Sequence, residues 1–176
     1  KAKYLVMIMS LSLLLTSTTC EDDNFYDKSI KIDNLIDVET NPNYNVGDII
    51  YVNSLFSRYL PEEGYSNFLD IYKTTGSNKF GFNISLFKKD ASNDWISEDL
   101  SQTTLLDKGE IRFNTIYNYY DKNCLPVLNT SNNNYEFRVG IKLLEPGEYE
   151  LSINTILSPI DIKNKVNLEI FTTIDG

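Results

Sequence analysis

The side chains that could carry out chemistry in this chain are mainly carboxylates, because the sequence contains no histidine. Without histidine there is no Ser-His-Asp or Cys-His arrangement and no histidine-ligated zinc site. Glu62, Glu63 and Asp70 could still serve a glycosidase, which needs two acids at a fixed separation across a cleft. Acids are abundant here, however, and neighbouring acids in loops are usually solvated. We therefore expect no catalytic residues, and a small hydrolase is the least favoured function.

A thiol and a possible metal loop are the other reactive features. Cys124 lies beside apolar residues in the stretch NCLPVL, which favours a buried, inert cysteine over a nucleophile. The stretch KDASND offers oxygen ligands from Asp90, Asn93 and Asp94, but its spacing is not that of an EF-hand loop. We therefore expect no metal site.

The beginning of the chain has the pattern of an export signal. Lys1 and Lys3 precede an apolar run over residues 5–15, LVMIMSLSLLL. A run of this length matches the apolar core of a signal peptide and is too short to span a membrane. The sequence therefore predicts a signal peptide over residues 1–19.

The residues after this run point to a lipid anchor. Small hydroxyl residues lead to Cys20, and the acids Glu21, Asp22 and Asp23 follow. This arrangement resembles bacterial lipoprotein signal peptides, whose cysteine becomes the first residue of the mature chain and receives a diacylglycerol thioether and a further acyl chain, such as palmitate. The resemblance implies that Cys20 carries this covalent lipid, and we expect no other cofactor. Three acyl chains, at about 0.8 kcal/mol per buried methylene, would make the anchor effectively permanent.

The acidic cluster bears on which side of the membrane the protein faces. An acidic run directly after the lipidated cysteine is similar to the signal by which Bacteroidota send lipoproteins to the outer face of the outer membrane. The resemblance implies a lipid-anchored outer-membrane protein that faces the cell exterior, and the Asn- and Tyr-rich composition is typical of a low-GC flavobacterium. The alternative is a solvated tether on a protein that stays in the periplasm. In both cases residues 20–29 form the lipidated cysteine and its tether.

Charge and length limit the remaining possibilities. The chain has 16 Lys and Arg residues against 25 Asp and Glu residues, a formal net charge of −9. Phosphate binding needs a basic face, so we do not expect nucleic acid as a partner. The length after the tether suits a single domain, residues 30–176.

Period-two alternation of apolar and polar residues predicts a protein built from β-strands. The clearest run is 135–144, and a second covers 148–156. Between them Pro146 and Gly147 have the chemistry of a type II turn, which predicts a β-hairpin over 135–156. Further strands are predicted at 28–38, 48–56, 67–72, 79–88 and 166–174.

These short strands predict an all-β fold, an antiparallel β-sandwich of immunoglobulin-like kind. Residues 97–134 do not follow the alternation, so we expect an irregular insertion there. Loops and insertions on a rigid sandwich are also where binding functions usually lie.

The candidate binding surface is aromatic. It consists of Trp95, Tyr117, Tyr119 and Tyr120, and such rings stack on sugars or anchor protein interfaces. The alternative is that Trp95 and two of the tyrosines pack on the sandwich.

Three functions remain open. The one we favour is a non-catalytic accessory subunit of an outer-membrane complex, such as a transporter, a barrel-assembly machine or a secretion machine, with an outer-membrane β-barrel or another lipoprotein as partner. The second is a glycan-binding module that feeds a TonB-dependent uptake system, and the third is the hydrolase. Exposure of the aromatic surface in a groove would favour glycan binding, whereas a flat patch or a sheet edge would favour the subunit.

Overall fold

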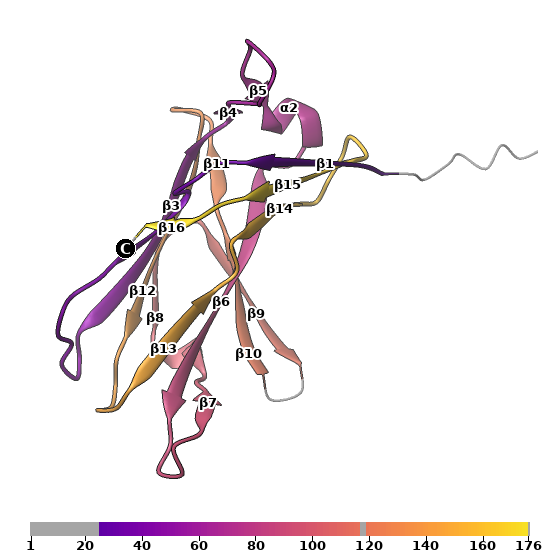
Figure 1. The fold of residues 1–176 in the computed structure, drawn as a ribbon. Helices are drawn as coiled ribbons and strands as arrows, with labels where there is room; N and C mark the ends of the chain where they lie inside the picture. The colour runs from indigo at the N-terminus through magenta and orange to yellow at the C-terminus, as the bar shows by residue number, and fades with distance from the viewer. Residues whose placement is uncertain (1–24, 117–118, 176) are drawn as a thin grey trace, which may run out of the picture.

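The fold is almost entirely β-strand, as Figure 1 shows. The computed structural model describes residues 25–116 and 119–175. In these residues 14 strands form one large mixed sheet, strongly curled into a half-barrel, and β4 (Tyr59–Leu60) pairs separately with β5 (Leu69–Asp70). The β-rich class predicted from the sequence is confirmed. The expected division into two antiparallel sheets is not evident, because the curled sheet is continuous.

The strands of the large sheet are short and follow one another closely along the chain. They are β1 (Tyr26–Lys31), β2 (Ile36–Glu39), β3 (Ile49–Ser57), β6 (Lys79–Lys89), β7 (Trp95–Ser97), β8 (Thr104–Lys108), β9 (Glu110–Ile116), β10 (Tyr119–Leu125), β11 (Val127–Asn129), β12 (Asn134–Lys142), β13 (Tyr149–Ile153), β14 (Ile156–Ile160), β15 (Val166–Phe171) and β16 (Ile174–Asp175). The helical elements described are α2 (Ile71–Thr75) and a 3₁₀ turn (Leu100–Gln102). β1 thus begins ahead of residue 30, where the sequence placed the start of the domain.

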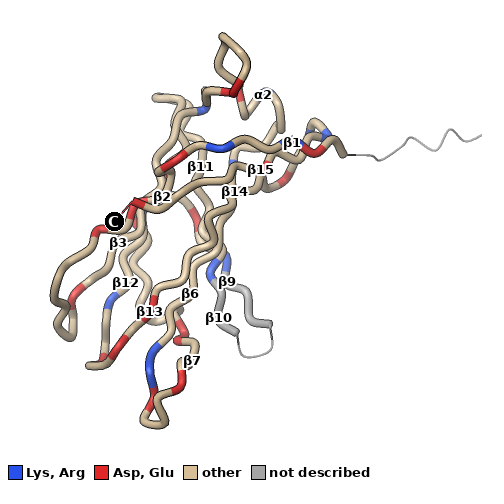
Figure 2. Tube along the Cα trace, viewed as in Figure 1, with Lys and Arg blue, Asp and Glu red and all other residues tan. Residues whose placement is uncertain are grey.

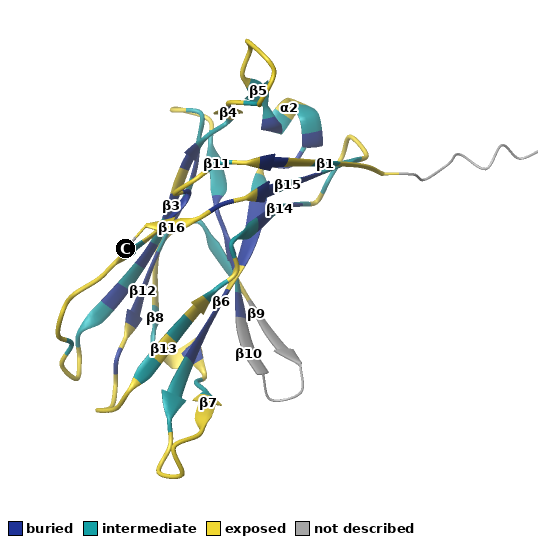
Figure 3. Cartoon of the chain, in the orientation of Figure 1, coloured by how far each residue is buried: buried dark blue, intermediate teal, exposed yellow. Residues whose placement is uncertain are grey.

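Strand β6 is the centre of the sheet. It pairs with β13 and β14 along one side and with β7, β10 and β11 along the other. Its alternating residues Phe80, Phe82, Ile84 and Leu86 are buried on the inner face, as the period-two pattern predicted. The core is therefore the space enclosed by the curl, and Figure 3 shows buried positions along these inner strands.

An aromatic cluster fills the core where β3, β6 and β12 meet. The rings of Phe56 and Tyr135 stack with centroids 5.1 Å apart, and Phe80 meets Tyr135 edge-on at 5.2 Å. The Tyr135 hydroxyl donates to the carbonyl of Ser77 at 2.8 Å, so its polar atom has a partner inside the core. Burial also raises the pKa of this phenol. The cluster therefore fixes three strands against one another.

The predicted hairpin over 135–156 is wrong. β12 pairs with β3, β8 and β11, whereas β13 pairs with β6, so the two strands diverge after Lys142. Gly147 has a φ of 159°, which is nearly extended and does not fit the predicted type II turn. The connection is instead held to the β2–β3 loop, because the Gly47 amide donates to the Leu143 carbonyl at 2.7 Å and the Leu143 amide donates to the Asp48 carbonyl at 2.9 Å.

Three further predictions need correction. The sheet is not purely antiparallel, because β1 runs parallel to β15 and β2 parallel to β16. The strand predicted over 67–72 is limited to Leu69–Asp70, since Asp70 caps α2 and Gly76 ends it in the left-handed conformation. The expected irregular insertion over 97–134 contains β8, β9, β10 and β11, which are regular members of the sheet.

Gly109 makes the sharp connection between β8 and β9, and its substitution should be costly. Its φ is 80°, and a Cβ there would lie 2.6 Å from the Leu125 carbonyl oxygen and 2.7 Å from the Phe137 ring. We expect Gly109→Ala to lower the free energy of unfolding by about 1–3 kcal/mol from backbone strain alone, and by more because of the clash. Gly64→Ala is the matched control, since Gly64 has a φ of 82° in open space. Urea unfolding measures both free energies. If the two variants lose the same free energy of unfolding, the close contacts around Gly109 do not contribute to the cost of its substitution.

Candidate functional site

Several residues of the predicted site lie outside the described part of the chain. They are the lipidation residue Cys20, the export residues Glu21, Asp22 and Asp23, and Tyr117. Tyr119 and Tyr120 begin β10, where their backbones pair with β9. In the described residues no helix has the length and apolarity needed to cross a membrane. The lipid anchor and the export signal therefore remain predictions.

Trp95 lies on a sheet edge and is not part of the core. It belongs to β7, which pairs with β6 and with no other described strand, and its side chain is 43% exposed. The Lys89 ammonium lies 5.3 Å from the centre of its ring and pairs with Glu148 at 2.7 Å. Figure 2 shows a basic stretch of β6 beside β7. β7 and β10 pair with different parts of β6.

Strand β8 is a second exposed edge that the sequence did not indicate. It pairs with β12 and with no other described strand, so one row of its backbone groups has no strand partner among the described residues. Leu106 lies opposite the buried Val139 and therefore faces inward, yet it is 48% exposed because the curl is open there. Leu105 lies opposite Gly140 on the outer face and is 51% exposed.

The two edges carry similar apolar side chains. Ile96 of β7 lies opposite Lys88 and is 50% exposed, so β7, like β8, presents one large apolar side chain on each face. Only the 3₁₀ turn and its flanking residues separate β7 from β8 along the described chain. We call Trp95, Ile96, Leu105 and Leu106 the edge patch.

Two of the three carboxylates considered for hydrolysis have structural partners, and the third, Glu63, is exposed. Asp70 accepts two hydrogen bonds from Arg58, at 2.7 and 2.5 Å, and also caps α2 through the Lys73 amide. Glu62 pairs with Lys28 at 2.6 Å. The hydrogen bonds from Arg58 lower the pKa of Asp70 below its ordinary value. This favours the charged form and a structural role for Asp70.

The lowered pKa of Asp70 predicts an acid-dependent stability. A carboxyl group whose pKa is lower in the folded state stabilises the fold above its unfolded pKa, and this stabilisation is lost as the pH falls through the folded value. We expect Asp70→Asn, which keeps a capping side chain, to lower the free energy of unfolding by about 1 kcal/mol at pH 7. The difference in free energy of unfolding between the wild type and Asp70→Asn, measured by urea unfolding, should vanish well below about pH 4. Asp33→Asn is the control, since the Asp33 pair with Lys31 is exposed and 3.8 Å long.

The other reactive residues of the sequence also have structural roles. Cys124 is fully buried, as predicted, and burial raises the pKa of its thiol, which disfavours the nucleophilic thiolate. Asp90 accepts hydrogen bonds from the amides of Ser92 and Asp94, which closes the β6–β7 loop. Among the described residues no three Asp, Glu or Cys side chains gather as metal ligands would.

Lys122 is a buried cation that sequence reasoning missed. Its Cα lies opposite the inward-facing Ile84, and its side chain is buried. The ammonium lies 3.5 Å from the Asp99 carboxylate, and Asp99 in turn caps the 3₁₀ turn. This pair joins β10 to the segment between β7 and β8. Because residues 97–134 do not follow the apolar alternation, no local sequence pattern marked Lys122 as buried.

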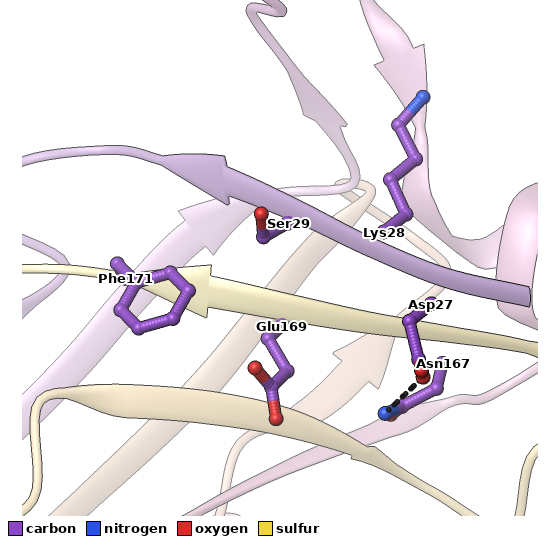
Figure 4. Close-up of a pocket in the computed structure, with 6 residues that line it drawn as sticks. All are labelled: Asp27, Lys28, Ser29, Asn167, Glu169 and Phe171. Carbon is purple, nitrogen blue, oxygen red and sulfur yellow. Dashed lines mark hydrogen bonds between the residues drawn. The ribbon is translucent and has the colours of Figure 1, made fainter.

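Two hollows are candidate binding sites. The first, of about 350 Å³, lies on the β1–β15 pair. Figure 4 shows the Glu169 carboxylate between the Phe171 ring and Asp27, which accepts a hydrogen bond from Asn167 at 3.1 Å. The second, of about 600 Å³, lies between the β2–β3 loop, the start of β3 and strand β13. We call it the mouth pocket.

We compared the chain with known protein families, curated proteins and solved structures. No protein-family model, curated protein or solved structure matches the chain.

Proposed function

We propose that this protein is a non-catalytic, lipid-anchored accessory subunit of an outer-membrane protein complex. In this proposal Cys20 carries the lipid, Glu21, Asp22 and Asp23 direct export to the cell exterior, and the edge patch binds an outer-membrane β-barrel or another lipoprotein. The observation that carries the proposal is the pair of short edge strands, β7 and β8, with large exposed apolar side chains on both faces. The proposal holds whether or not the curled sheet is classed as an immunoglobulin-like sandwich, since it depends only on the edges.

The physical argument concerns what soluble proteins usually avoid. Edge strands are normally protected by charge, proline or a covering segment, because their unpaired backbone groups and apolar side chains bind other chains. The only charged residues of β8 are Asp107 and Lys108, at its end, and these pair with Arg138 and Glu136 of β12. A partner strand added to β8 would cover Leu106 and complete the inner face. The lipid anchor would keep the protein at a high effective concentration near a membrane partner, so a small interface is sufficient.

A paired substitution tests the proposal. The native lipoprotein is purified in mild detergent, and the proteins recovered with it are compared with those from Leu105→Glu/Leu106→Glu. We expect a membrane protein to be recovered with the wild type and lost, at least about tenfold, from the double variant. Phe68→Glu is the control, because Phe68 is also a large, exposed apolar residue but lies in the β4–β5 loop. A partner retained by the double variant would refute binding through β8.

Glycan binding is the second candidate, and the β1–β15 hollow favours it. An exposed aromatic ring beside a carboxylate and an amide is the combination that stacks on and hydrogen-bonds a sugar. In this reading Phe171→Ala removes retention on insoluble polysaccharide, whereas Trp95→Ala does not. If the polysaccharide retains both variants equally, the hollow is not the glycan-binding site. A hydrolase remains the least favoured function, because Asp70 is held by Arg58.

A further inference from the structure

The mouth pocket is the place where the core opens to solvent. Its deep wall consists of Ile50, Leu86 and Leu151, which are the inward-facing residues of β3, β6 and β13. Figure 1 shows the beginnings of β3 and β13 at the same end of the half-barrel. The volume of about 600 Å³ lies within the range typical of small-molecule sites.

Aromatic faces complete the walls. The Tyr44 hydroxyl donates to the Glu39 carbonyl at 3.1 Å and accepts from the Asn41 amide at 2.9 Å. The Tyr149 hydroxyl donates to the Glu145 carbonyl at 2.9 Å. Because both hydroxyls are tied to backbone groups, the tyrosines contribute mainly their ring surfaces to the pocket.

The pocket is held open by backbone hydrogen bonds. Leu143, which lines it, is bonded on both sides to the β2–β3 loop, through the Gly47 amide and the Asp48 carbonyl. Asp48 also accepts a hydrogen bond from the Asn45 amide at 2.7 Å, which fixes the loop that carries Val46. A ligand would therefore enter a preformed site and would not have to order its walls.

The charge of the lining restricts the ligand. Glu145 is the only charged residue among the described residues that line the pocket, and its carboxylate pairs with the Lys88 ammonium. A charged ligand would lose its hydration without gaining a free counter-charge. We propose that the mouth pocket binds an uncharged, largely apolar ligand of small-molecule size. This inference does not rest on the proposed docking function, because the edge patch consists of other residues.

The test uses the full chain produced without lipid and without detergent. N-phenyl-1-naphthylamine, an uncharged fluorescent probe of apolar sites, is titrated and then displaced. We expect saturable binding with one probe per chain, displacement by 1-decanol, and at least about tenfold weaker displacement by decanoate. The absence of saturable binding would refute the site, and better displacement by decanoate would refute an uncharged ligand.

Two variants locate the binding. Val46, 56% exposed at the rim, tolerates a charge, so Val46→Glu should weaken probe binding at least about tenfold while the fold is kept. Leu151→Trp should fill the pocket and have the same effect. Phe68→Glu adds the same charge elsewhere and should bind like the wild type. If Leu151→Trp does not fold, the test rests on Val46→Glu alone. If Val46→Glu binds the probe as tightly as the wild type does, the probe binds elsewhere and the proposal is wrong.

Discussion

Phe80→Ala is expected to remove a large part of the stability of the fold. Phe80 is fully buried and contacts both other rings of the aromatic cluster, with centroid distances of 5.2 Å to Tyr135 and 6.0 Å to Phe56. Truncation of such a ring usually lowers the free energy of unfolding by about 3–5 kcal/mol, because the transfer free energy is lost and a cavity remains. The total for a domain is only about 5–15 kcal/mol. Thermal unfolding should shift down by about 6–20 °C.

Phe68→Ala is the control for this prediction. Phe68 is also a phenylalanine, but its side chain is exposed in the β4–β5 loop, so its loss should change the free energy of unfolding by less than about 0.5 kcal/mol. A small effect of Phe80→Ala, close to that of the control, would mean that the cluster does not join the strands. The core described for the half-barrel would then be wrong.

Cys20→Ala is expected to abolish lipidation completely. If the sulfur of Cys20 carries the diacylglycerol, no other atom can replace it, and the protein should keep its signal segment and incorporate no labelled palmitate. Loss of acyl chains worth about 0.8 kcal/mol per buried methylene would also remove the protein from the outer-membrane fraction. Metabolic labelling followed by fractionation measures both effects.

The second cysteine provides the matched control. Cys124→Ala also removes one sulfur, but Cys124 is fully buried, so the label and the membrane association should be unchanged. Incorporation of label at the wild-type level in Cys20→Ala would refute the anchor.

Local patterns predicted the strands better than their partners. The alternation over 79–88 identified β6 because one face of that strand is the core. The same logic located β12, but it could not show that β12 pairs with β3 and β8 while β13 pairs with β6. Turn residues indicate that a chain reverses, but the neighbour of a strand depends on contacts distant in sequence. The parallel pairing of β1 with β15 joins the two ends of the described chain and has no local signal.

The candidate sites were also hard to predict, because they depend on contacts between residues distant in sequence. Trp95 was identified by residue type, and its exposure could not be judged until β7 was seen to be an edge strand. Leu105 and Leu106 look like ordinary core residues in the sequence and are exposed only because the sheet ends at β8. The mouth pocket combines residues from the β2–β3 loop, β6 and β13. The caps of α2, by contrast, could have been read from Asp70 and Gly76.

Photocrosslinking in whole cells tests the docking proposal most directly. A photoreactive amino acid is placed at Leu106 of the edge patch, at Trp95, or at Phe68 as the control, all exposed in the described structure. We predict that the first two positions crosslink to the same outer-membrane protein and that the control position does not. The absence of an adduct at both Leu106 and Trp95, or the same adduct from all three positions, would contradict docking through the edge strands.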